Sequence, residues 1–244
     1  MPKAKFPGRL RCSATFVFIF AIVTAARGNE RNAPALSPDE ADRHSLTAAD
    51  SIAPPGLPTM GKWMISADGS IAHWLDEIYE GKRLREPINV VLVDAAAASA
   101  DDAKQRLVAA AAAAGYPIRF GHSTGYRALI GGQIYAQLPA GRDDAFSNRI
   151  FELSNNHGRI FGPSSMDGAY VFIGAFSREE VRFRSPEHGY ASFNRARDDF
   201  SQNLDRSTQF RLRGFVDMAN AIVGDPEITT GDHDGLAVLL RAER

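Results

Sequence analysis

His157 and Arg159 are the residues whose types and spacing point most directly to chemistry. They stand two positions apart in the segment 157–161, His-Gly-Arg-Ile-Phe, which is typical of a β-strand. Side chains two residues apart in a strand point to the same face. An arginine offers a planar fork of donors, so an arginine and a histidine on one face could bind a carboxylate or a phosphate. The pair is therefore a candidate site for an anionic group.

Other polar residues fall near the ends of the expected strands and the start of a helix. Such positions can converge at one rim of a sheet and form a functional site. The alternative is a buried network of Arg–Asp and His–carbonyl contacts that holds the sheet to a helix, because buried polar groups must be paired whatever their role. The candidate cluster comprises His157, Arg159, Arg178, His188, Arg197, Asp198 and Asp232, and the polar residues Glu179, His233 and Asp234 adjoin it in the sequence.

The segment 231–235, Gly-Asp-His-Asp-Gly, has the composition of a metal or acid–base cluster. Adjacent strand side chains point to opposite faces, and Asp and Gly are ordinary turn residues, so a turn before the last strand is favoured. The motifs His-Glu-x-x-His and Gly-x-Ser-x-Gly and the Walker loop are absent from the sequence. We therefore expect no metal site and no cofactor.

The elements that position these residues are expected to form an α+β fold. The β-branched run 88–94 predicts a buried strand, and Ser99 can cap a helix over 99–114 that ends at Gly115. The fold class is a mixed β-sheet with packed helices in a single domain. The other expected elements are helices at 71–82, 192–204 and 208–223, strands at 116–120, 149–153, 157–161, 169–176, 181–184 and 236–240, and a turn at 154–156.

Residues 1–28 are typical of a signal peptide. Four cations within residues 1–11 precede the thirteen residues 14–26, which are apolar apart from two threonines. As a helix this run rises about 20 Å, short of the roughly 30 Å hydrocarbon core of a bilayer. Small residues before position 29 suit cleavage after Gly28, so the expected location is periplasmic or secreted. An uncleaved anchor and a buried helix are the alternatives.

Residues 29–60 are rich in proline and alanine and are expected to form a disordered linker to a domain over 61–244. Cleavage removes five of the 28 cations and no acid, which leaves 23 cations against 29 acidic residues and a net charge of −6. This balance gives no electrostatic support for nucleic-acid binding. No later stretch is long and apolar enough to cross a bilayer. The single cysteine, Cys12, would be removed with the signal peptide.

The order of short segments between about residues 87 and 240 resembles the LssY-like C-terminal domain family, over about two thirds of the chain. Members of that family are often joined to membrane-embedded segments, some with phosphatase-like domains, and the resemblance implies no specific activity. The resemblance implies two consecutive histidines before the arginine. This chain has only one there, His157, and Asn156 stands in the place of the other. The segments that carry the resemblance are 87–93, 113–116, 157–161, 171–179, 188, 196–198, 224–226 and 230–232.

Two functions follow as hypotheses. The first is an envelope-associated binding or accessory module with a membrane or envelope protein as its partner, suggested by the linker and by the absence of a catalytic signature. The second is a hydrolase acting on phosphate- or carboxylate-bearing envelope substrates, suggested by the set His157, Arg159, His188 and Arg197.

Overall fold

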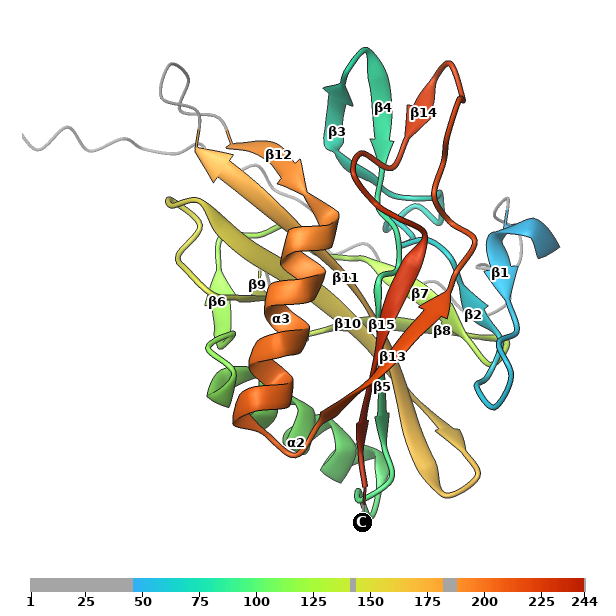
Figure 1. Ribbon diagram of the computed structural model, residues 1–244, viewed down its shortest axis with the longest axis vertical. Coiled ribbons are helices and arrows are strands. Elements are labelled where there is room, and N and C mark those ends of the chain that lie inside the picture. Colours follow the sequence, from blue (N-terminus) through green and yellow to red (C-terminus); the bar gives the residue numbers. More distant parts are fainter. Residues whose placement is uncertain (1–45, 141–143, 182–187, 244) are drawn as a thin grey trace, which may run out of the picture. The chain divides into compact units, whose positions relative to one another are not determined.

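The computed structural model describes residues 46–140, 144–181 and 188–243, apart from the side chains of Asp76 and His188. The expected signal peptide and residues 29–45 of the expected linker lie outside the described residues. Most of the described elements are strands, arranged in a mixed sheet with two α-helices (Figure 1). No helix among these residues has the length and apolar character needed to cross a membrane.

The described part of the chain begins with a short 3₁₀ helix and ends with a strand. In sequence order its elements are η1 (Ala48–Asp50), β1 (Ser51–Ile52), β2 (Met60–Gly61), β3 (His73–Tyr79), β4 (Lys82–Arg85), β5 (Val90–Asp94), α2 (Ala100–Ala113), β6 (Ile118–Phe120), β7 (Arg127–Ile130), β8 (Gln133–Leu138), β9 (Asp144–Ser147), β10 (Asn155–Met166), β11 (Ala169–Val181), β12 (His188–Ser192), α3 (Phe193–Ser207), β13 (Arg211–Asp217), β14 (Ile228–Thr229) and β15 (Leu236–Ala242).

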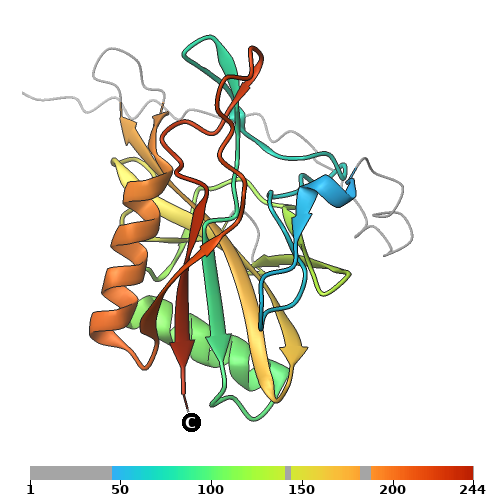
Figure 2. The same ribbon diagram turned by 45° about the vertical axis from the view of Figure 1, so that its right-hand side comes forward.

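The large sheet is built around the long hairpin of β10 and β11. Its hydrogen-bonded path is β1-β2-β7-β8-β10-β11-β5-β15-β13, with β12 and β9 pairing to the hairpin and β6 to β9. Strand β15 runs parallel to β5, whereas β5 and β10 run antiparallel to β11, so the sheet is mixed as expected. A small second sheet, β14-β4-β3, stands at one end of the large sheet (Figure 2).

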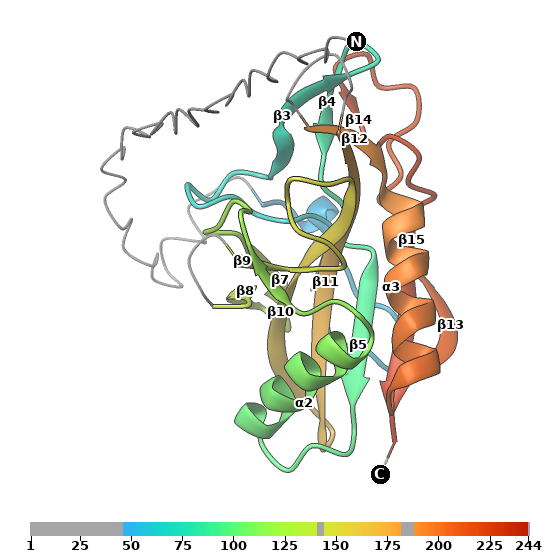
Figure 3. The same cartoon turned by 90° about the vertical axis from the view of Figure 1, so that its left-hand side faces the viewer.

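Helices α2 and α3 cover one face of the central strands, and β7 and β8 lie on the other side of them (Figure 3). Both helices begin where the sequence predicts, because Ser99 and Ser192 accept a hydrogen bond from a backbone N–H in the first turn. The aromatic rings of Phe176 in β11 and Phe200 in α3 stack with centroids 4.0 Å apart. Burying such a side chain stabilises the fold by about 2 kcal/mol, so this contact helps fix α3 on the sheet.

The opposite face carries the odd-numbered residues of β11 and, up to the register shift after Phe161, those of β10. Ile173 and Ala175 of β11 belong to an apolar cluster on this side, and Ile160 and Phe176 belong to the cluster under the helices. This alternation follows from the two-residue period of a strand. The face away from the helices is therefore the one that presents His157 and Arg159.

The expected helix at 71–82 is wrong, because these residues form β3 and enter β4. Glu80 and Gly81 both have positive φ, 51° and 80°, and connect the two strands as a tight turn. The apolar residues at helical spacing in this segment do not share one buried face, because Trp74 is buried, whereas Leu75 and Ile78 are exposed. Pairing between strands, which local periodicity does not report, decided the conformation.

Four further expectations also require correction. The segment 208–223 is not a helix, because residues 211–217 form β13 and pair antiparallel with β15. Residues 149–153 are not a strand, and 154–156 is not a turn, because β10 already begins at Asn155 and β9 pairs with it. Residues 46–60 do not belong to a disordered linker, because β1 pairs with β2, and Met60 of β2 pairs with Ile130 of β7.

Candidate functional site

A cavity of about 230 Å³ opens on the face of β10 and β11 that lies away from the helices. The hairpin supplies its ionisable floor, the loop between β6 and β7 supplies one wall, and β3 with the residue after β4 supplies another. The lining residues are Trp74, Leu75, Glu86, Gly121, His122, Ser123, Tyr126, Phe151, His157, Arg159 and Glu179.

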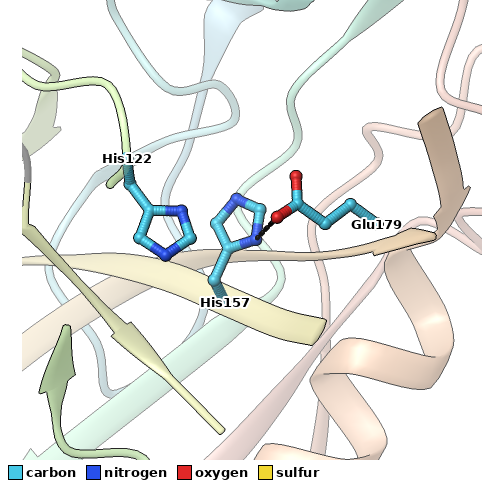
Figure 4. Close-up of side chains that lie close together, drawn as sticks. All are labelled: His122, His157 and Glu179. Carbon is cyan, nitrogen blue, oxygen red and sulfur yellow. Dashed lines mark ion pairs between the residues drawn. The ribbon is translucent and has the colours of Figure 1, made fainter. Parts of the chain in front are cut away.

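His157 and Glu179 are brought together by the register of the hairpin. His157 of β10 lies opposite Ser177 of β11, and Asn155 lies opposite Glu179, so all four residues share one face. The Nδ1 atom of His157 is 3.9 Å from Oε1 of Glu179, and both side chains are buried (Figure 4).

Asn155 orients both of these side chains. Its Nδ2 donates to Oε1 of Glu179 and to the carbonyl oxygen of Leu153, which identifies Oδ1 as the acceptor. Nδ1 of His157 lies 3.1 Å from that oxygen, and its Nε2 lies 3.4 Å from Oγ of Ser177. The His157 ring and the Glu179 carboxylate are therefore held in place from behind.

His122 extends into the cavity from the loop between β6 and β7. Its ring stacks on the ring of His157, with centroids 4.5 Å apart and an interplanar angle of 29° (Figure 4). The preceding Gly121 has φ of 106°, and a Cβ atom there would lie 2.2 Å from the Phe151 ring. Only glycine fits this position, so the close approach of the loop to Phe151 sets where His122 enters. One ligand atom each from His122, His157 and Glu179 lies within 4.8 Å of the others, which makes this a group of described residues that could hold a metal ion.

Arg159 lies on the same face, two residues beyond His157. Its guanidinium lies over the Tyr126 ring at 5.0 Å, and its Nη2 donates to the carbonyl oxygen of Ser123 at 2.9 Å. The side chain is 4% exposed, and within the described part of the chain its Nε has no hydrogen-bond partner. No carboxylate of the described residues lies within ion-pair distance of it. A buried guanidinium in this state has donor capacity left for a ligand.

Glu86 follows β4 and supplies a second carboxyl group to the cavity. Burial raises its pKa to about 7, and the positive charge of Arg159 opposes that rise. Near neutral pH the carboxyl group is therefore partly protonated. It neutralises the Arg159 charge only incompletely. Glu179 adds a second carboxyl group beside His157, so the place in the cavity that suits an anion is the Arg159 guanidinium itself.

Apolar side chains stand at the mouth of the cavity. Leu75 is 58% exposed and Phe151 is 37% exposed, and both belong to the lining. Leu75 also has φ of 46°, a left-handed conformation that costs a non-glycine residue about 1 kcal/mol or more. The cavity thus combines an ionisable floor with an apolar rim.

The expected cluster is divided by the structure, because Arg197 and Asp198 of α3 do not line this cavity. Arg197 donates from Nη1 and Nη2 to Asp234, at 2.6 and 3.1 Å, and from Nε to Asp198 at 2.8 Å. Its Nη1 also donates to the carbonyl oxygen of Leu236. These contacts tie α3 to the start of β15. Arg197 and Asp198 therefore belong to a structural network, the alternative to a functional site.

Asp232 also serves a structural purpose. It accepts hydrogen bonds from the hydroxyls of Tyr190 and Ser192 and from the backbone N–H of Phe193, at the start of α3. The adjacent His233 has its Nε2 2.7 Å from Oδ1 of Asn220. As the sequence favours, the segment 231–235 is a turn before the last strand, and its polar side chains face neighbouring elements.

Arg178 lies on the face of β11 opposite to His157. Its Nη1 donates to Oδ1 of Asn156 and its Nε to Glu180. The backbone of His188 lies at the start of β12, and its side chain lies outside the described residues. Of the seven candidates, His157 and Arg159 line the cavity, together with their expected neighbour Glu179.

His122 and Glu86 are site residues that the sequence did not predict. His122 sits in the loop segment Gly-His-Ser-Thr-Gly, and Glu86 precedes a proline at the start of a buried strand. A histidine between two glycines and an acid directly before a buried strand were the available signals, and neither has a period that indicates where its side chain points. No family model, curated protein or solved structure matches this chain.

Proposed function

We propose that the domain binds a small molecule through a phosphate or carboxylate group that Arg159 holds inside the cavity. The observation that carries the proposal is the buried guanidinium, whose Nε has no hydrogen-bond partner among the residues described. A buried charge is costly unless it is paired, and a phosphate or carboxylate oxygen would pair it. The partly protonated Glu86 and the apolar rim suit a ligand with an anionic end and an apolar body.

Isothermal titration calorimetry of the full chain at pH 6 tests this proposal, with phenyl phosphate, benzoate and inorganic phosphate as ligands. We expect Arg159→Gln to weaken binding at least tenfold, which corresponds to about 1.4 kcal/mol. Arg195→Gln is the matched control, because it removes one cation whose side chain is 69% exposed on α3. Arg159→Lys keeps the charge, loses the fork and is used if the glutamine variant does not fold.

Two results would count against the anion site. One is a wild-type chain that binds none of the three ligands. The other is unchanged affinity in a folded Arg159 variant. A loss of affinity in Arg195→Gln as large as that in Arg159→Gln would show only a general effect of charge.

A hydrolase acting on phosphate- or carboxylate-bearing envelope substrates is the second candidate function. It is favoured by the convergence of two imidazoles and two carboxyl groups on the cavity that holds Arg159. Such groups at close range can serve as general acid and base beside a bound anion. Release of p-nitrophenol from p-nitrophenyl phosphate and p-nitrophenyl acetate measures this activity. Hydrolysis that persists unchanged in folded His157→Gln would rule out His157 as the acid or base, and hydrolysis that persists in Arg159→Gln as well would count against the cavity.

We also propose the biological setting from the sequence. Residues 46–244 are inferred to be a single domain of the LssY-like C-terminal kind, an envelope-associated module exported by residues 1–28 and able to meet a membrane or envelope protein. The support is the basic tip followed by an apolar run, and the order of short segments along the chain. Mass spectrometry of the protein from a periplasmic fraction tests export, and a species that retains Met1 would contradict cleavage.

A further inference from the structure

We propose that His122, His157 and Glu179 form a binding site for one divalent transition-metal ion of the zinc type. Two imidazoles and one carboxylate each present a ligand atom within 4.8 Å of the other two, and all three side chains are buried. They come from three different elements, the loop after β6, strand β10 and strand β11, so the tertiary fold assembles the group.

The spacing is close to what a metal ion requires. Zinc lies about 2.1 Å from imidazole nitrogen and carboxylate oxygen, so tetrahedral ligand atoms stand about 3.4 Å apart. The ligand atoms here are at most 4.8 Å apart. Side-chain rotations that move each ligand atom by about 1 Å would bring them to the separation that a tetrahedral metal ion requires. Imidazole with carboxylate is a ligand set that suits Zn²⁺ and neighbouring divalent ions, and the group contains no thiolate.

The contacts behind the group are those that metal ligands need. Asn155 reaches both His157 and Glu179 through its side-chain amide. Ser177 lies against the other nitrogen of His157, and its Oγ accepts from Nε1 of Trp74 at 3.0 Å. Partners of this kind fix the ring orientation and tautomer of a ligating histidine. Each ring nitrogen of His157 has one such neighbour, so a metal bound at one nitrogen would displace that contact, and the contact at the other nitrogen would keep the ring in place.

The number of ligands points to an accessible metal rather than a purely structural one. Structural zinc sites are closed by four protein ligands, whereas catalytic sites use three and leave a position for water or substrate. All three side chains line the same cavity as Arg159, so the remaining position would face the space where an anion is proposed to bind. The metal site does not depend on that anion, since its ligands are complete without Arg159.

Cobalt titration of the full chain, purified without a histidine tag and stripped with a chelator, tests the proposal. We expect one equivalent of Co²⁺ to produce a visible absorption band that Zn²⁺ abolishes by displacement. Calorimetry with Zn²⁺ should give one site, weakened at least 100-fold in His122→Gln and in Glu179→Gln. His73→Gln is the matched control, because it removes a histidine of β3 that is not part of the group.

Circular dichroism and melting temperature show whether each variant is folded. Because an ion that binds only the folded state raises Tm, Zn²⁺ should raise the Tm of the wild type and of His73→Gln but not of the two ligand variants. If either ligand variant fails to fold, the other decides. A wild-type chain without the cobalt band, or folded ligand variants with unchanged affinity, would overturn the site. Arg159→Gln should keep the metal, which separates this outcome from that of the anion proposal.

Discussion

Replacement of Glu86 by glutamine should alter how the stability of the protein depends on pH. Burial raises the pKa of this carboxyl group from 4.5 to about 7, against the effect of Arg159. Because the folded state binds the proton more tightly than the unfolded state, the contribution to stability is complete below pH 4.5 and is lost as the pH rises through 7. Glutamine mimics the protonated acid at every pH.

The expected size follows from the pKa change. Each tenfold change in proton affinity is about 1.4 kcal/mol, so moving the pKa from 4.5 to about 7 corresponds to about 3 kcal/mol over the whole range. Part of this is already lost at pH 5. Between pH 5 and pH 8 the free energy of unfolding of the wild type should fall by about 2 kcal/mol relative to Glu86→Gln.

Urea denaturation followed by tryptophan fluorescence measures this difference at pH 5 and pH 8. Trp63 and Trp74 are both buried, so unfolding exposes each of them to solvent. Other titrating groups contribute equally to both chains and cancel in the comparison. Glu227→Gln, an exposed acid before β14, is the matched control and should show no such divergence. If wild type and Glu86→Gln differ by the same amount at both pH values, the protonated carboxyl group is refuted.

Three further predictions concern other parts of the fold. Gly121→Ala should weaken Zn²⁺ binding in calorimetry, because the added Cβ would meet the Phe151 ring. Gly132→Ala is the control and should leave binding unchanged, because Gly132 also has positive φ but has open space around it. Equal effects of the two substitutions would show that only the backbone conformation matters. The pKa of His233 is lowered by burial to about 4, so the protein should lose about 3 kcal/mol of stability as the pH falls from 6.5 through 4, and urea titrations of His233→Gln should lack that loss. Arg197→Gln should lower the free energy of unfolding by about 2 kcal/mol without changing ligand binding, and a loss of phenyl phosphate affinity in the folded variant would contradict its structural role.

Local sequence determined the elements whose signals lie within a few residues. The β-branched run of β5, the serine cap of α2, the helical stripe of α3 and the apolar run of β11 all act on their own segment, and each prediction is confirmed. The shared face of His157 and Arg159 also needed only the two-residue period of a strand. These features were predictable because their physical cause is short-ranged.

Pairing over long distances decided the segments whose conformation the sequence predicted wrongly. The segments 71–82 and 208–223 have apolar spacings compatible with a helix, yet they become β3 with β4 and β13 because partner strands satisfy their backbone groups. The partner strand of β13, β15, lies well beyond it along the chain. The pairing of β3 with β4 depends on a turn with two positive φ values. Local periodicity reports neither of these conditions.

The site itself was divided between the two kinds of information. The sequence alone established that His157 and Arg159 share a face, and it marked Glu179 as a polar residue worth attention. Only the tertiary structure decided that the hairpin register sets Glu179 beside His157 and that a loop 35 residues earlier returns His122 to stack on that ring. Loops have no period, and the register between two strands depends on packing across the whole sheet, so the convergence exists only in the folded chain.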